Sequence, residues 1–389
     1  MKNTCIYVLS FIAIIFVSCE QGSNHDSNGD YENITFLREV YSSGDNSNWP
    51  AAKLHESIDT STFQDIGSLP EVNYPVHNPF TKEKAALGED LFFDPRLSSS
   101  GQIACASCHN PKKGWTDGIE KSIGHKGEIG KRNAMTIINI AHSTSLFWDG
   151  RAKTLEEQVS FPIEDPIEMN EKFGIALSRI ANIPYYQEKF ANAFEDGKVS
   201  DKNLRKAMAT FQRSVQSQNS RFDQFVNGND TILTDQEILG LHLYRTKANC
   251  ISCHNTPYFS DNQFHNDGQT LLGSKHEDLG LFNITKDTSD MGKFRTPTLR
   301  EIEYTGPWMH HGNFPTFLDV VEYYNHGNPA PISKKHLKTN DPKIAVLRNS
   351  EILEPLELSK EEVDFLIQFL KTLSSPYTNS NKTEVVVEP

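Results

Sequence analysis

The sequence predicts a mainly α-helical protein built from two domains with long loops. Helix-capping patterns recur along the chain, strand-like alternating runs are scarce, and a C-x-x-C-H pattern occurs twice, at residues 105–109 and 250–254. A length of 389 residues suits two or three domains. The composition, with 37% hydrophobic residues, is typical of globular proteins, and a formal charge of −13 argues against a nucleic-acid partner.

The first residues are typical of an export signal. The apolar run from Cys5 to Val17 has the length of a signal peptide and is short for a membrane-spanning helix. It ends at Cys19 in a pattern similar to the lipobox of bacterial lipoproteins, in which this cysteine carries the lipid; a conventional cleaved signal is the alternative. We expect a signal peptide over 1–19, a disordered polar tether over 20–48 and a location on the periplasmic side of the bacterial cell envelope.

Polar caps mark the expected helices that follow. Ser, Thr and Asn side chains accept hydrogen bonds from the free N–H groups of a first helical turn. The predicted helices, each written from its cap, run from Thr81 to Asp90, Asn170 to Ile183, Ser200 to Gln218, Thr234 towards Cys250, Thr316 to Tyr324 and Ser359 to Leu373. A polar turn at Asn227–Asn229 favours a boundary near residue 230, so the predicted domains span 50–230 and 231–375.

The two C-x-x-C-H motifs predict covalently attached haem. Two thiols at this spacing can add to the two vinyl groups of one porphyrin, and the adjacent His then lies under the iron as its proximal ligand. The sequence therefore predicts two haem c groups, each in a cytochrome c-like domain. The residues that attach and ligate them are Cys105, Cys108 and His109 for the first haem, and Cys250, Cys253 and His254 for the second.

Zinc and disulfides are the alternative uses of these cysteines. Two C-x-x-C pairs can form a four-thiolate zinc site, but such pairs usually lie about 15–20 residues apart. Here the chain between Cys108 and Cys250 is long enough for a whole domain. With Cys5 in the signal and Cys19 at the anchor, haem attachment uses every remaining thiol.

Further motifs around the first haem resemble those of a known family. They are Leu87–Ser98, Ile123–Gly127, Arg132–Ala134 and Phe147–Arg151, in this order along the chain. Together they resemble the bacterial dihaem cytochrome c peroxidases and their relative MauG, over about residues 76–373. The resemblance implies an oxidoreductase with an N-terminal peroxidatic haem domain and a C-terminal electron-transfer haem domain.

The resemblance assigns roles near the first haem. His125 matches a ligand that covers the oxidised iron and leaves on activation, and neighbouring glycines would let its loop move. Glu168 and Gln158 match a pair that assists O–O cleavage by moving a proton and binding peroxide, with Glu164 as the alternative carboxylate. Trp148 matches a residue that relays electrons between the haems. Without the resemblance, each would be taken for an ordinary loop, surface or core residue.

The distal ligand of the second haem is Met in the peroxidases and Tyr in MauG. The matching residue here is Tyr324, with Tyr323 as the alternative register and with Met309 and His310 as lesser candidates. Methionine is absent after Met309. A tyrosinate favours oxidised iron, so this haem should be harder to reduce than a Met-ligated one.

Calcium and redox partners follow from the same resemblance. Asn133, Thr305 and Pro307 match a calcium site between the domains, since calcium accepts backbone as well as side-chain oxygens. The expected reaction is reduction of hydrogen peroxide with electrons from a small redox protein, a cytochrome c or a copper protein. The alternatives are a MauG-like oxidase of a protein or small substrate, and a non-catalytic dihaem electron carrier. A homodimer is also compatible with the sequence.

Overall fold

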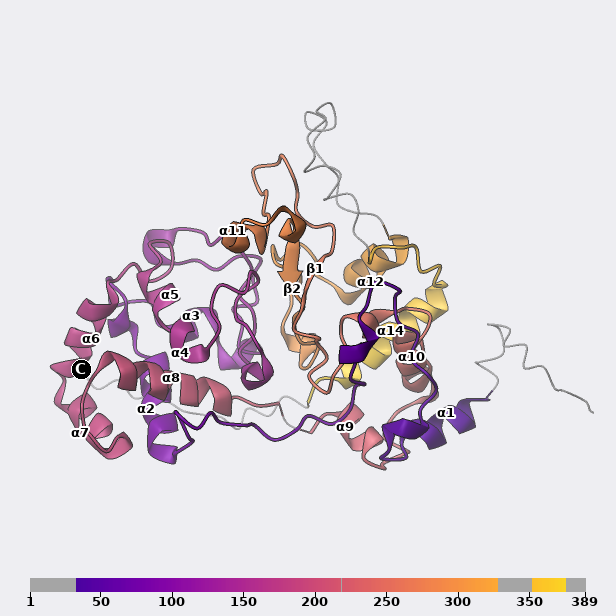
Figure 1. The fold of residues 1–389 in the computed structure, drawn as a ribbon, viewed down its shortest axis with the longest axis horizontal. Helices are drawn as coiled ribbons and strands as arrows, with labels where there is room; N and C mark the ends of the chain where they lie inside the picture. The colour runs from indigo at the N-terminus through magenta and orange to yellow at the C-terminus, as the bar shows by residue number, and fades with distance from the viewer. Residues whose placement is uncertain (1–32, 218, 328–351, 376–389) are drawn as a thin grey trace, which may run out of the picture. The chain divides into compact units, whose positions relative to one another are not determined.

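Residues 33–217, 219–327 and 352–375 are described by the computed structural model, and most of them form helices and irregular loops (Figure 1). The helices up to residue 214 are α1 (Ile34–Tyr41), α2 (Lys82–Phe92), α3 (Cys105–Cys108), α4 (Leu155–Gln158), α5 (Ser160–Glu164), α6 (Phe173–Ala181), α7 (Pro184–Ala193) and α8 (Asp201–Ser214). Those that follow are α9 (Arg221–Val226), α10 (Asp235–Arg245), α11 (Phe282–Thr285), α12 (Phe317–His326) and α14 (Lys360–Thr372). The strands within these ranges are the antiparallel pair β1 (Phe264–Asn266) and β2 (Lys293–Arg295). The mainly α fold class is confirmed.

Five of the expected helices begin at their predicted caps. The side-chain oxygen of each cap accepts a hydrogen bond from the backbone N–H three residues later; these caps are Thr81, Ser200, Thr234, Thr316 and Ser359. At the last three, the carboxylate of the third residue also accepts a hydrogen bond from the backbone N–H of the cap, which completes a capping box. These contacts involve only sequence neighbours, which is why the sequence predicts them.

The helix expected from Asn170 begins elsewhere. Asn170 has a left-handed backbone with φ 49°, and α6 starts at Phe173. Pro184, which follows the expected helix end at Ile183, is the first residue of α7, where its missing N–H leaves no hydrogen bond unmade. Helix α8 ends at Ser214, because Val215 is already extended; the expected end, Gln218, lies outside the described residues.

The predicted disordered tether is wrong for residues 34–48. Helix α1 forms there, and its buried Tyr41 places the hydroxyl 2.8 Å from Nδ1 of His242. The guanidinium of Arg245 lies over the rings of both Tyr41 and Trp49. The segment is ordered because α10, far away in the sequence, buries its few large side chains. The expected signal and Cys19 lie outside the described residues.

Two helix pairs pack with unusually close backbones. Helix α2 lies against α8, and α10 lies against α14 (Figure 1). A Cβ atom on Gly88 would lie 2.0 Å from the carbonyl oxygen of Ala207, and one on Gly240 would lie 2.1 Å from that of Phe365. The close packing of each pair therefore requires a glycine. Helices α2 and α10 are also the helices that precede the two C-x-x-C-H motifs in the sequence.

Buried apolar residues form two large clusters. One runs from Leu87 to Val215, and the other combines Leu37–Ile66 with Phe222–Leu373. Residues 50–66, expected to open the first domain, pack in the second cluster instead. The residues from 34 onward belong to one compact unit, so the domain bounds near residue 230 stay a prediction. In the described part of the chain, no helix is long and apolar enough to cross a membrane.

Candidate haem-binding sites

The first C-x-x-C-H motif lies on the short helix α3. Cys105 and Cys108 are free, half-buried thiols. Burial raises the pKa of Cys105 to about 12 and that of Cys108 to about 11. His109 follows the helix, and its Nδ1 lies 3.2 Å from the carbonyl oxygen of Trp115. A carbonyl only accepts, so Nδ1 carries the proton and Nε2 is the nitrogen available to a metal.

Aromatic side chains surround this histidine. The ring of Phe92 lies 6.2 Å from that of His109, 6.0 Å from that of Trp115 and 5.2 Å from that of Phe211. Burial lowers the pKa of His109, which keeps the imidazole neutral. A neutral imidazole in an apolar wall is the form that binds iron.

The structure brings His125 and Glu168 together. The backbone N–H of His125 donates to the carbonyl oxygens of Ile167 at 2.7 Å and Glu168 at 2.9 Å. His125 is buried, with Nδ1 3.4 Å from the hydroxyl of Ser99. A Cβ on Gly124 would lie 2.0 Å from the Ile167 carbonyl oxygen, so this glycine also allows a close backbone contact.

Glu168 is a carboxyl group whose surroundings disfavour its ionised form. Burial raises its pKa, the charge of Asp165 adds to the effect, and Arg151 opposes it. The charge of Glu168 in turn raises the thiol pKa values of Cys105 and Cys108, so it lies near the attachment site. A carboxyl with a raised pKa near a metal site can accept and return a proton at moderate pH.

The other two distal candidates differ in position. Gln158 ends α4 and is half-buried. Glu164 is exposed, and its Oε1 accepts a hydrogen bond from the backbone N–H of Phe173 at 3.3 Å, at the start of α6. Glu164 therefore acts as a helix-capping group.

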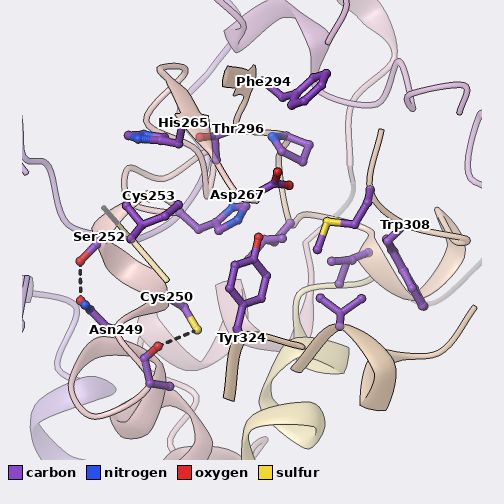
Figure 2. Close-up of a pocket in the computed structure, with 18 of the residues that line it drawn as sticks. Asn249, Cys250, Ser252, Cys253, His265, Asp267, Phe294, Thr296, Trp308 and Tyr324 are labelled. Carbon is purple, nitrogen blue, oxygen red and sulfur yellow. Dashed lines mark hydrogen bonds between the residues drawn. The ribbon is translucent and has the colours of Figure 1, made fainter. Parts of the chain in front are cut away.

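The second C-x-x-C-H motif opens on a cavity of about 730 Å³ (Figure 2). Cys250, Cys253 and His254 all line it. Nδ1 of His254 lies 3.1 Å from the carbonyl oxygen of Phe259, which repeats the arrangement at the first motif. Burial raises the pKa of Cys250 to about 12 and lowers that of His254. The volume falls in the range of cofactor sites, about 300–1,000 Å³.

Tyr324 lines the same cavity from α12. Figure 2 shows its hydroxyl directed into the cavity, on the side where Asp267 lies. The hydroxyl of Tyr323 instead donates to the carbonyl oxygen of Asp267 at 2.8 Å. Met309 also lines the cavity, whereas the ring of His310 stacks on Phe294 at 3.6 Å. Of the two tyrosines, Tyr324 is the one that lines the cavity, and its role as a haem ligand stays a prediction.

Two ionisable residues of this cavity were not predicted from the sequence. Asp267 lines it, and burial raises the pKa of this carboxyl to about 7. Arg295 on β2 lines it as well and is 2% exposed. Neither belongs to a local pattern that distinguishes it from a surface charge, so no sequence signal was available.

Trp148 joins the segments of the two motifs. Its Nε1 donates to the carbonyl oxygen of Asn133 at 3.0 Å, and its own carbonyl oxygen accepts from the N–H of Arg295 at 2.8 Å. The indole is 9% exposed and lines the second cavity. Trp148 therefore packs at a junction between distant segments, and its role as an electron relay stays a prediction.

The three calcium candidates line this cavity together. They are Asn133, Thr305 and Pro307. The amide Nδ2 of Asn133 donates to the carbonyl oxygens of Ile119 and Glu120 at 3.0 and 3.3 Å, which leaves its oxygen as the atom for a cation. The arrangement is compatible with a calcium site, and binding itself stays a prediction.

The geometry disfavours zinc. In the described ranges, Cys253, Asp261 and His265 are the one group of three potential metal ligands with mutually close donor atoms, and the two cysteine pairs do not combine. Separate pairs of half-buried free thiols, each beside an imidazole oriented through Nδ1, fit two haem groups instead.

Comparison with known proteins identifies the family. The model of the family described as di-haem cytochrome c peroxidase matches residues 82–231. Cytochrome-c peroxidase IdrP1 of Pseudomonas sp. (strain SCT) is 34% identical over 338 residues, covering 79% of this chain and 85% of that protein. The chain belongs to the di-haem cytochrome c peroxidase and MauG family.

The chain is similar to other members of the di-haem peroxidase and MauG family as well. Methylamine utilization protein MauG of Methylorubrum extorquens (strain AM1) is 35% identical over 320 residues, covering 80% of this chain and 86% of that protein. The crystal structure of a MauG-like protein associated with microbial copper homeostasis has a TM-score of 0.70 and 33% identity, covering 83% of this chain and 96% of that one. The chain is accordingly an oxidoreductase with haem c cofactors, which disfavours a purely electron-carrying protein.

Proposed function

We propose that this protein reduces hydrogen peroxide to water at the first haem site, with electrons that a small redox protein delivers at the second. The reaction consumes two electrons and two protons for each peroxide and yields two waters. The observation that carries the proposal is Glu168, a carboxyl with a raised pKa beside the Cys105–His109 motif and in contact with the His125 loop. A bound haem iron supplies a coordination position for peroxide and one-electron redox chemistry.

Glu168 performs the proton transfer. Its carboxylate takes the proton from one peroxide oxygen and returns it to the oxygen that departs as water. Gln158 hydrogen-bonds the peroxide and holds it in line. His125 covers the site in the resting enzyme and withdraws on activation. His125 and Glu168 share a backbone contact, so this withdrawal also changes the surroundings of Glu168.

Electrons pass between the two sites through Trp148. The indole Nε1 donates to the carbonyl oxygen of Asn133, and the backbone carbonyl oxygen of Trp148 accepts from the N–H of Arg295, so this residue contacts segments near both motifs. An indole in such a position shortens the steps that an electron must make.

A MauG-like oxidase is the second candidate function, and Tyr324 is the observation that favours it. A tyrosinate ligand would keep the second iron oxidised, which suits storage of an oxidising equivalent more than acceptance of electrons from a weak donor. The substrate would then be a protein or small molecule oxidised through long-range electron transfer.

We also propose that the protein is exported and anchored by a lipid on Cys19, on the periplasmic side of the bacterial envelope. The support is the signal-like sequence that ends at Cys19. Bacterial c-type haem is attached outside the cytoplasmic membrane, so export agrees with the haem motifs. A periplasmic cytochrome c or copper protein would then be within reach as the donor.

Peroxide turnover with defined donors tests the function. We expect rapid peroxide consumption with a reduced small cytochrome c or a reduced copper protein. If every small donor fails while a larger protein is oxidised, the MauG-like function replaces the peroxidase. If neither iron reacts with peroxide in any redox state, both enzyme proposals are wrong. Spectra of the oxidised and half-reduced forms, with Tyr324→Phe as control, report whether the tyrosinate is bound.

A further inference from the structure

Three arginines of the described chain are fully buried, and they differ in their partners. Arg245, Arg295 and Arg300 are 1%, 2% and 1% exposed. Arg245 forms an ion pair with Asp65, and Arg300 forms a two-pronged pair with Asp223 at 3.0 Å. In the parts of the chain that the structure describes, no carboxylate pairs with Arg295.

Arg295 contacts neutral groups at long distances. Nε donates to the Phe147 carbonyl oxygen at 3.3 Å, and Nη1 to the Ser143 hydroxyl at 3.4 Å and the Thr296 carbonyl oxygen at 3.3 Å. Nη2 lies 3.4 Å from the sulfur of Met135. The Tyr258 hydroxyl is also close. The three N···O distances lie beyond the usual range of about 2.7–3.2 Å for N–H···O hydrogen bonds.

Such a guanidinium needs an anion. Removal of a charge from water is costly unless an opposite charge and well-formed hydrogen bonds replace the solvent. Arg245 and Arg300 satisfy this requirement, because each forms an ion pair with a carboxylate of the protein. Arg295 does not, so the described part of the chain leaves its charge uncompensated.

The anion can come from the cavity. Arg295 lines the cavity of Cys250 and His254, and its chain neighbours Phe294 and Thr296 are visible at the cavity wall in Figure 2. Asp267 lines the same cavity but forms no ion pair with Arg295 among the described contacts. Haem, the group that this motif attaches, carries two propionate carboxylates at one edge. The planar fork of a guanidinium suits a carboxylate.

We propose that Arg295 binds a propionate of the second haem and that its positive charge raises the reduction potential of that haem. A cation near the iron stabilises the reduced form, which has one negative charge more. Arg295 would thus offset part of the effect of the Tyr324 ligand. Because its backbone N–H and Nε donate to the carbonyl oxygens of Trp148 and Phe147, the propionate would also be connected to the proposed relay.

The test compares Arg295→Met, Arg295→Lys and the control Met135→Leu, each as the full-length haem-loaded protein. Met135 lines the same cavity and contacts Arg295, but it carries no charge. In Arg295→Met we expect the reduced-to-oxidised ratio of the second haem, at a fixed solution potential, to fall at least tenfold, which is about 59 mV for one electron. In Arg295→Lys this ratio should fall less, and in Met135→Leu it should equal that of the wild type. Spectroelectrochemical titration measures these ratios.

Resonance Raman spectra of the propionate bending band give a second measurement. The band should shift in both Arg295 variants and not in the control. An Arg295→Met protein that carries both haems with the wild-type potential and band would overturn the proposal. If this variant fails to fold, an Arg295→Lys protein with an unshifted band would overturn it equally. The inference rests on the haem at the second site and not on peroxide turnover, so either proposal can fail without the other.

Discussion

His109 and His254 each donate through Nδ1 to a backbone carbonyl, at 3.2 and 3.1 Å, and both have a pKa lowered by burial. Two irons bound in this way would have nearly equivalent proximal sides. The two sites differ in their other residues: Glu168 and the His125 loop lie near the first motif, and Tyr324 lines the cavity of the second. We therefore expect these residues to decide which site performs proton chemistry.

Replacing Glu168 with Gln is expected to slow peroxide consumption by about 10²- to 10⁴-fold, the usual contribution of a positioned acid–base group. Only the ionised carboxylate can take the peroxide proton. Because burial raises the pKa of Glu168, wild-type activity should fall as the pH drops through a value above the ordinary carboxyl range. Stopped-flow rates across the acidic range measure both effects.

Glu164→Gln is the matched control for this experiment. Glu164 belongs to the same stretch of chain but is exposed and caps α6, and Gln can still accept that hydrogen bond. Its peroxide rate should equal that of the wild type. Equal rates in the wild type and Glu168→Gln, or a loss confined to Glu164→Gln, would show that the proton is moved by another group.

At the scale of elements, the two helix pairs α2–α8 and α10–α14 support the motifs. Each pair brings its backbones together at one glycine, Gly88 or Gly240. Both glycines lie within a helix, where glycine is unfavourable by itself. Their presence is explained by packing, since any side chain would separate the two helices.

Gly240→Ala is expected to lower the free energy of unfolding by about 1–3 kcal/mol or more, the usual cost of overpacking. The added Cβ would lie 2.1 Å from the Phe365 carbonyl oxygen. Gly174→Ala is the control, because a Cβ there meets nothing within 4 Å and alanine favours a helix. Denaturant unfolding of both variants measures the difference. Equal stabilities would mean that α10 and α14 can move apart at little cost.

At the scale of the whole molecule, one arginine connects distant segments around Trp148. Arg132 pairs with Asp149 at 2.6 Å through Nη1 and with Asp278 at 2.6 Å through Nε. Asp278 lies in the segment that connects β1 to β2 in the sequence. Arg132 directly precedes Asn133, and Asp149 directly follows Trp148. The second cavity and the candidate calcium site are thus assembled from segments that only the complete fold brings together.

Calcium should stabilise the folded protein as a whole. If Asn133, Thr305 and Pro307 hold Ca²⁺, saturation at about 100 times the dissociation constant adds roughly 2.7 kcal/mol. Chelator-treated protein should therefore unfold at a lower temperature than protein with added Ca²⁺, and Asn133→Ala should remove most of the difference. Differential scanning calorimetry measures it. A melting temperature that is unaffected by both chelator and Ca²⁺ would exclude the site.

The sequence by itself determined the covalent chemistry and the local structure of this protein. The C-x-x-C-H motifs and the caps at Thr81 and Ser359 depend on residues a few positions apart, so they are visible without a fold. Tertiary structure decided the rest. It ordered α1 through distant contacts and directed Tyr324 into the cavity, while the Tyr323 hydroxyl donates to a backbone carbonyl. It also left Arg295 without a paired carboxylate among the described residues. Burial and ion pairing depend on residues far apart in the chain, and no local pattern records them.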